Sequence, residues 1–270
     1  MKIQTRLIIG ILFLSILGCD KNDENVTAMD GDFIFISTDF ETQNIFPPWE
    51  KQCNPESFSI VSKTPRKGTY CAKFSIDSSE YWTSPSSGIK SARSEIQIFK
   101  VAPAQKEIYY GWSMKIPEDY IESSDWQVMG QFHDQPDYEN GETWENYPAN
   151  SPPVSLTYKN GKIGVTVNIP YGNGSEVISE RSITKGQWTD IILHIYWSAN
   201  SNGYIEAWIN DVPMTDNSGT ITRYNFRNLY NNSGNYLKIG LYRSNEIKTK
   251  NVVYFDEIKS GLTYNDVKIN

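Results

Sequence analysis

The segment Tyr236-Leu237-Lys238-Ile239-Gly240-Leu241-Tyr242 alternates polar and apolar residues over its whole length. Because successive side chains of a strand point to opposite faces, its leucines and its isoleucine would enter a core. Lys238 and Tyr242 would then share the other face, across Gly240. This pattern predicts a strand of an antiparallel sheet that is buried on one side and carries chemistry on the other.

Two more segments place polar side chains on one face of a predicted strand. In the first, Arg93, Glu95 and Gln97 are spaced two residues apart, and in the second Gln131 and His133 flank a phenylalanine. The segments are Arg93-Ser94-Glu95-Ile96-Gln97 and Gln131-Phe132-His133. A cluster of arginine, glutamine, histidine, lysine and tyrosine on one face of a sheet can bind and deprotonate an acidic sugar.

Alternation of the same kind recurs along the chain, and 13% of its residues are aromatic, which favours strands. Asn160-Gly161, Asn202-Gly203 and Asn210-Asp211 suit tight hairpins, and helical periodicity is confined to a short stretch at 119–125. We therefore predict an all-β fold, a β-jelly roll sandwich of two curved antiparallel sheets with a concave substrate cleft, over one domain, 31–270. The other strand segments are 33–36, 109–116, 162–167, 191–197, 204–209 and 252–258.

Together the three polar segments resemble the R-[ST]-E, Q-[IV]-H and Y-F-K-A-G-x-Y motifs of jelly-roll polysaccharide lyases, which include alginate lyases, glucuronan lyases and heparin lyase I-type enzymes. The likeness extends to 111–117, 186–188 and 203–210. Gln97 stands where alginate lyases usually carry a second arginine, and Arg243-Ser244 replaces their Asn-Gln. The resemblance implies β-elimination on glucuronan, a heparin-like chain or alginate, giving a 4,5-unsaturated uronate end, with no cofactor required for the chemistry.

In such a reaction, a base removes the proton at C5 of a uronate and an acid protonates the departing O4. Arg93 and Gln131 would neutralise the carboxylate, since donors placed in advance lower the barrier. His133 is the candidate base, because an imidazole titrates close to neutral pH. Tyr242 is the candidate acid, and the resemblance implies that it can also serve as base when both groups leave from one face.

Other residues are expected to bind the sugar chain rather than to transfer protons. Lys238 can hold a carboxylate, and a long loop at 134–153 offers Trp144 for stacking on a sugar ring. The candidate substrate-binding residues are Lys238, Glu95, Gln97, Arg243 and Trp144. The second histidine, His194, lies in a segment apolar on both faces and is interpreted as a buried structural residue.

The amino-terminal end resembles a bacterial lipoprotein signal. Basic residues precede an apolar run, which ends in small residues before Cys19. We expect a signal peptide at 1–18, lipidation of Cys19 and a tether at 19–30 that resembles the surface-export signals of Bacteroidetes lipoproteins. The protein would then be anchored in the outer membrane by its lipid, facing the periplasm or the cell surface.

Cys53 and Cys71 would remain after processing, and in an oxidising compartment they suit a disulfide, with two buried thiols as the alternative. Glu41 and Asp256 are candidate ligands of a structural calcium ion, since hard oxygen donors suit calcium and terminal strands of jelly rolls often lie side by side.

The formal net charge is −7, so an anionic polysaccharide must be met by a local basic patch rather than by overall attraction. No basic stripe or nucleic-acid-binding motif is present, which argues against a nucleic acid partner. We expect a monomer. The alternative function is a non-catalytic surface lipoprotein that binds carbohydrate, because one scaffold serves many functions.

Overall fold

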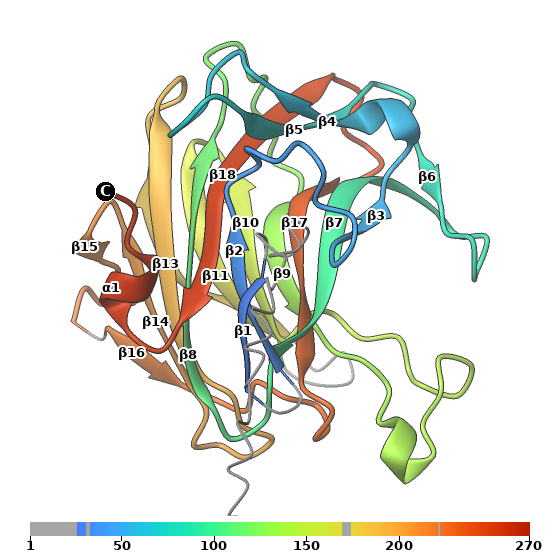
Figure 1. Cartoon of the computed structure of the whole chain (residues 1–270), viewed down its shortest axis with the longest axis vertical. Helices are drawn as coiled ribbons and strands as arrows, with labels where there is room; N and C mark the ends of the chain where they lie inside the picture. The colour runs from blue at the N-terminus through green and yellow to red at the C-terminus, as the bar shows by residue number, and fades with distance from the viewer. Residues whose placement is uncertain (1–25, 31–32, 169–173, 221) are drawn as a thin grey trace, which may run out of the picture.

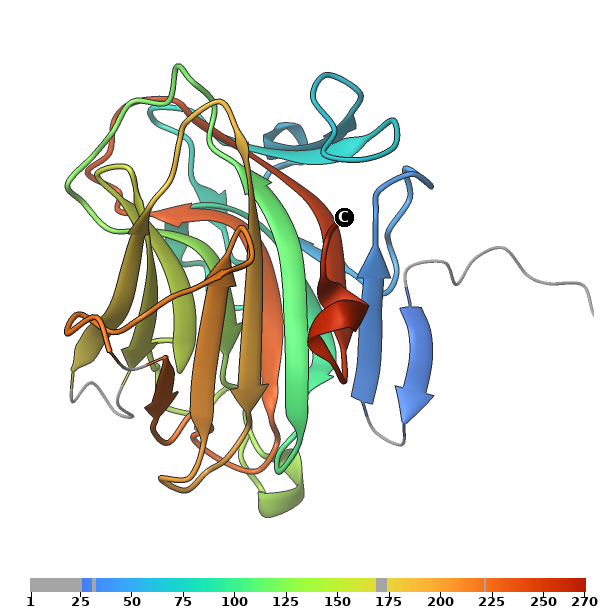
Figure 2. The same cartoon turned by 90° about the vertical axis from the view of Figure 1, so that its left-hand side faces the viewer.

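In the described residues, which are 26–30, 33–168, 174–220 and 222–270, a computed structural model shows two antiparallel sheets packed face to face (Figures 1 and 2). The predicted signal peptide and Cys19 lie outside this part of the chain. The fold is the predicted jelly roll. No helix of the described residues is long and apolar enough to cross a membrane.

The first sheet has 10 strands in the order β1-β2-β18-β8-β13-β14-β15, with β16 on β14 and the β4–β5 pair on β18. Its strands are β1 (Val26–Asp30), β2 (Phe33–Thr38), β4 (Phe58–Val61), β5 (Cys71–Ile76), β8 (Glu107–Lys115), β13 (Trp188–Tyr196), β14 (Tyr204–Ile209), β15 (Val212–Pro213), β16 (Arg223–Asn225) and β18 (Asn251–Gly261).

The second sheet has 8 strands in the order β12-β11-β10-β9-β17-β7-β3, with β6 on β7. They are β3 (Glu50–Gln52), β6 (Trp82–Thr83), β7 (Lys90–Ala102), β9 (Gln127–His133), β10 (Val154–Lys159), β11 (Lys162–Asn168), β12 (Ser175–Ser182) and β17 (Asn235–Arg243). All three polar segments, on β7, β9 and β17, therefore belong to this sheet, as neighbours.

Aromatic side chains fill the space between the sheets. Phe132 of β9 packs against Tyr110 of β8, with ring centroids 4.6 Å apart, and against Trp197 at 5.0 Å. The apolar residues of the 236–242 segment, such as Ile239, are buried in the same core. The face of the 8-stranded sheet that points away from this core, which we call the polar face, carries the intervening polar side chains.

Local signals explain several boundaries. Asn160 and Gly161 both have positive φ in the turn between β10 and β11, as do Asn210 and Asp211 between β14 and β15. This conformation matches the twist of paired strands, so these two predicted hairpins are confirmed. The third, at Asn202-Gly203, is not a tight turn, because β13 ends at Tyr196 and pairs with β14 from Tyr204, which leaves a longer loop between them.

Three expectations about the chain differ from the structure. The 119–125 stretch forms no helix; the helical turns of the described residues are η1 (Pro55–Ser57), η2 (Tyr138–Asn140) and α1 (Tyr264–Val267). The predicted tether at 19–30 does not stay unstructured to its end, because Val26–Asp30 forms β1, which pairs with β2.

The third difference concerns the two cysteines. Cys53 and Cys71 are both free and buried, so the predicted disulfide is wrong. Cys71 begins β5 in the 10-stranded sheet, whereas Cys53 directly follows β3 at the edge of the other sheet. Burial raises the pKa of Cys53 to about 11 and that of Cys71 to about 12, which keeps both groups as unreactive thiols.

Candidate active site

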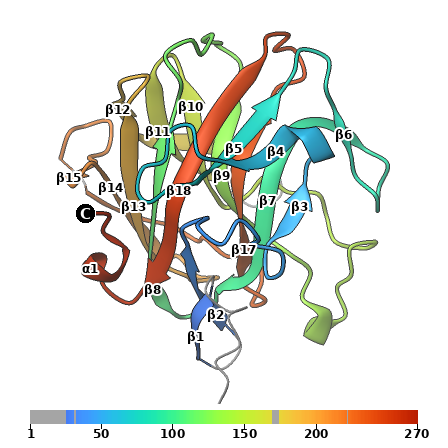
Figure 3. The same ribbon diagram turned by 45° about the horizontal axis from the view of Figure 1, so that its top comes forward.

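Strand register brings the predicted residues together on the polar face, because β9, β17 and β7 lie side by side (Figure 3). On β17, Lys238 lies opposite Gln131 of β9 on one side and opposite Gln97 of β7 on the other. Tyr242 lies opposite Arg93. The sites predicted from three distant segments therefore form one continuous surface.

Gly240 makes this surface possible. Its φ is +142°, and the pairing of β17 with β9 shifts register between Ile239 and Tyr242. A Cβ at this position would stand 2.3 Å from the carbonyl oxygen of Ser94. Only glycine fits here, and the resulting bulge sets the direction of Tyr242 relative to Lys238.

Arg93 is held by groups on its own sheet. Its Nη1 donates to Gln52 Oε1 of β3 at 2.7 Å, and its Nε lies 3.3 Å from Glu95 Oε2. Its guanidinium also covers the ring of Tyr242, with Cζ 4.1 Å from the centroid. This cation–π contact holds the ring of Tyr242 in place on the polar face.

Glu95 is completely buried and organises the neighbouring strands. Besides its ion pair with Arg93, it accepts a hydrogen bond at 2.5 Å from the amide Nε2 of Gln131. Glu95 thus supports the site from within the sheet, while Gln97 donates to Glu50 Oε2 of β3 at 2.9 Å.

His133 has a fixed orientation. Its Nδ1 is 3.0 Å from both the backbone oxygen and Oδ1 of Asp134, so the neutral ring carries its proton on Nδ1. Nε2 is left as a proton acceptor. Burial raises the pKa of Asp134, but the hydrogen bonds from His133, Asn150 and Tyr147 more than offset this, so that its pKa is lowered overall and the carboxylate stays charged.

Aromatic side chains border the polar face. Trp144 is 53% exposed on the 134–153 loop, and its ring stands at 87° to that of Tyr236, with centroids 6.5 Å apart. Tyr236 in turn stacks near His133. At the other end of β17, Trp126 meets Tyr242 edge to face at 4.8 Å. Exposed indole rings at both ends suit stacking on sugar rings.

One predicted substrate-binding residue lies elsewhere. Arg243 is 1% exposed and donates to Thr249 O and Asp77 O, and it also bonds Asn251. It follows Tyr242 directly, so strand alternation turns it toward the opposite side of the sheet. Arg243 is a structural residue, and its predicted role in substrate binding is wrong.

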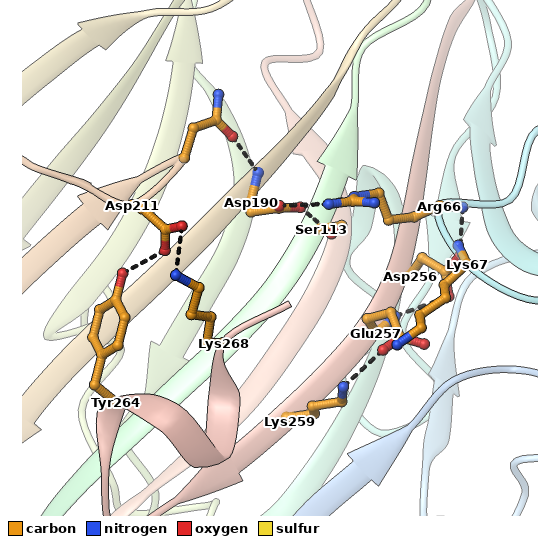
Figure 4. A network of polar contacts seen from close by, with 11 residues as sticks. Arg66, Lys67, Ser113, Asp190, Asp211, Asp256, Glu257, Lys259, Tyr264 and Lys268 are labelled. Atoms are coloured by element: carbon orange, nitrogen blue, oxygen red, sulfur yellow. Dashed lines mark hydrogen bonds and ion pairs between the residues drawn. The ribbon is translucent and has the colours of Figure 1, made fainter. Parts of the chain in front are cut away.

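The calcium prediction is not confirmed. The described residues contain no group of three or more His, Cys, Asp or Glu side chains that could hold a metal ion. Asp256 Oδ2 accepts backbone hydrogen bonds from Arg66 and Lys67 (Figure 4), and Glu41 Oε1 accepts from Thr69 and Tyr70. Both carboxylates therefore fix the turn before β5.

Asp256 gives the fold a pH dependence. Burial raises its pKa to about 7, from an ordinary value of 3.8, so between these values the folded state keeps a proton that the unfolded state has lost. The free energy of unfolding should fall as pH rises through this window, and Asp256→Asn should flatten that fall in urea titrations. Asp211→Asn is the control: Lys268 lowers the pKa of Asp211, so its contribution changes only below this window. Equal slopes in wild type and Asp256→Asn would contradict the assignment.

His194 is buried, as predicted, and lies in the 10-stranded sheet. Its Nδ1 and Nε2 are each 2.6 Å from a carboxylate, of Glu206 and Glu107 respectively, and its ring stacks on Tyr109. The polar face belongs to the other sheet. Only one of the two histidines therefore takes part in the candidate site.

Sequence reasoning missed Glu50, Gln52, Trp126 and Tyr236. Glu50 and Gln52 lie in a strand of three residues that shows no periodicity, and only its pairing with β7 brings them to the site. Tyr236 shares a face with Lys238, and the alternation of β17 was sufficient to find it.

A jelly roll with an oriented histidine, a tyrosine under a guanidinium and a central lysine on one face of a sheet is a scaffold for acid–base catalysis on an extended substrate. The chain belongs to the polysaccharide lyase family, because the family model described as polysaccharide lyase matches residues 36–259. It is therefore a polysaccharide lyase.

Solved structures agree with this fold. An endo-β-1,4-glucuronan lyase from the fungus Trichoderma reesei has 18% identity and a TM-score of 0.63, covering 82% of this chain and 94% of its own. Alginate lyase Aly36B in complex with an alginate trisaccharide has 11% identity and a TM-score of 0.58, covering 86% and 99%. The cellulose induced protein Cip1 has 14% identity and a TM-score of 0.54, covering 84% and 97%. The search of curated proteins gives no match.

Proposed function

We propose that this protein cleaves a uronic-acid-containing polysaccharide by β-elimination. The observation that carries the proposal is the arrangement along β17: His133, with Nε2 free to accept a proton, lies at one end, and Tyr242 lies beneath Arg93 at the other. Between them, Gln131 and Lys238 face the substrate side. Donors for a carboxylate and two proton-transfer groups thus share one surface.

In the proposed reaction, His133 Nε2 takes the C5 proton, the electron pair forms the C4–C5 double bond, and the C4–O4 bond breaks. Tyr242 gives its proton to O4, which leaves as the hydroxyl end of the other fragment. Tyr242 acting as both base and acid is the alternative for a sugar whose two groups leave from the same face. Afterwards His133 releases its proton to water and Tyr242 takes one up from water, which restores both groups for the next cycle.

For the substrate, we propose a glucuronate polymer ahead of alginate. Gln97 replaces the second arginine usual in alginate lyases and is bonded to Glu50, so this part of the polar face lacks a second guanidinium. The structural likeness to a glucuronan lyase supports the same choice.

The test uses the protein without residues 1–19 and a panel of glucuronan, alginate and an unsulfated heparin-like chain. Ultraviolet absorbance of the unsaturated uronate should rise with at least one polymer. Tight binding without any rise in absorbance would instead establish a non-catalytic carbohydrate-binding protein. If the protein neither binds nor cleaves any polymer of the panel, the proposal of an anionic polysaccharide as its ligand is refuted.

We also propose that the protein is a lipoprotein of the outer membrane, anchored through Cys19. The basic start, the apolar run and the cysteine that follows it support this proposal. Labelling of cells with a radioactive fatty acid should mark the wild-type protein and leave a Cys19→Ser variant unmarked.

A further inference from the structure

The centre of the polar face holds a lysine without a counter-ion. Lys238 is 3% exposed, and no described residue forms an ion pair or a hydrogen bond with its ammonium group. The ammonium instead lies near the ring of Tyr236, with Nζ 5.1 Å from the centroid. A charged amine in this position is poorly solvated and has no direct ion-pair partner in the described part of the chain.

The charged and titratable groups around Lys238 come from all the neighbouring strands. Arg93 and Glu95 of β7 pair with each other, and His133 of β9 is bound to Asp134. Glu50 of β3 accepts from Gln97, and Tyr236 lies on β17 itself. The carboxylates of Glu95 and Asp134 attract the lysine, but each is held by another partner. Burial, followed by the charge of Arg93, lowers the pKa of Lys238 to about 7.

The two residues first expected to neutralise the substrate carboxylate are already engaged. Arg93 donates to Gln52, pairs with Glu95 and covers Tyr242, and the amide of Gln131 is bonded to Glu95. Breaking these contacts would leave the completely buried Glu95 uncompensated, which is costly. Arg93 and Gln131 thus spend part of their donors on Glu95 and Gln52, whereas the ammonium group of Lys238 has no hydrogen-bond or ion-pair partner among the described residues.

We propose that Lys238 is the group that neutralises the substrate carboxylate, and that it gains its proton as the carboxylate enters. The uronate supplies the missing counter-ion, which stabilises the ammonium form and couples binding to the uptake of a proton. The inference rests on the proposed function, since it requires a uronate at this position. It reassigns Arg93 to holding Tyr242.

Calorimetry on the Tyr242→Phe variant, whose turnover should be about a thousandfold slower, tests the coupling. The probe is a β-1,4-linked glucuronic acid tetrasaccharide, titrated in buffers of different protonation enthalpy. About one pH unit above 7, we expect about one proton to be taken up per bound chain, and about one unit below 7, far less. Lys238→Arg should keep binding and abolish the uptake, because an arginine is always charged. Lys162→Arg, on β11 of the same sheet, should change neither.

Two further outcomes separate this inference from the proposed function. If the enzyme cleaves a polyuronate but takes up no proton, or takes up the same amount in Lys238→Arg, Lys238 enters charged and the inference is wrong while the function stands. If no polyuronate is cleaved or bound, both are wrong. Lys238→Met gives a kinetic check: KM should rise at least about tenfold on the acid side of 7 and much less on the alkaline side, where the native lysine is already neutral.

Discussion

Tyr242→Phe should lower the turnover number by about a thousandfold, within the range for loss of a group that transfers protons. The change removes only the hydroxyl. The ring keeps its contacts with the guanidinium of Arg93 at 4.1 Å and with Trp126 at 4.8 Å, so the site stays assembled. The measurement is the initial rate of unsaturated uronate formation at saturating substrate.

The control for this variant is Tyr196→Phe. Tyr196 lies on β13 in the other sheet, and its hydroxyl donates to Gln105 at 2.9 Å. Its loss should leave turnover unchanged. A Tyr242→Phe enzyme that retains more than about a tenth of the wild-type rate would remove Tyr242 from proton transfer, since even weak acid catalysis is worth more than this.

Gly240→Ala should destabilise the fold by about 4 kcal/mol or more, at the upper end of what single substitutions do. Two costs add. An L-residue rarely adopts a φ of +142°, and the new Cβ would stand 2.3 Å from the carbonyl oxygen of Ser94 and 2.8 Å from Glu95 Cα. Both contacts are with backbone, which cannot rotate away. Urea unfolding monitored by tryptophan fluorescence measures the loss.

Gly161→Ala separates strain from collision. Gly161 has a φ of +74° in the β10–β11 turn, and a Cβ added there would meet nothing within 4 Å. This variant should lose only about 1–2 kcal/mol, the cost of a left-handed residue alone. If the two alanine variants are equally stable, the backbone at Gly240 relaxes and the close approach of β17 to β7 is not a constraint.

Much of the site was predictable because it depends on strand alternation. The alternation of 236–242 placed Lys238 and Tyr242 on one face and the leucines in the core, as observed. The same rule, applied one residue further, would have assigned Arg243 to the opposite side. The prediction for Arg243 was wrong because it followed the family motif beyond Tyr242 and did not apply strand alternation.

Other features depend on pairing between distant segments, and local sequence does not encode this. Glu50 and Gln52 reach the site because β3 pairs with β7, some forty residues away. The separation of Cys53 from Cys71 has the same origin, because Cys53 follows β3 of the 8-stranded sheet and Cys71 begins β5 of the 10-stranded sheet. The orientation of His133 needs Asp134, its neighbour in sequence, but the burial that fixes Asp134 depends on Asn150 and Tyr147 of the long loop.

The place of β1 has a consequence for how the enzyme meets a long polymer. β1 is the outermost strand of the 10-stranded sheet, and the reacting residues lie on the other sheet. Six residues separate Cys19 from Val26, a reach of about 20 Å when fully extended. If Cys19 carries the lipid proposed above, the chain is attached beside the edge of the 10-stranded sheet, and the polar face of the 8-stranded sheet stays open to a polymer whose two ends both lie in the medium.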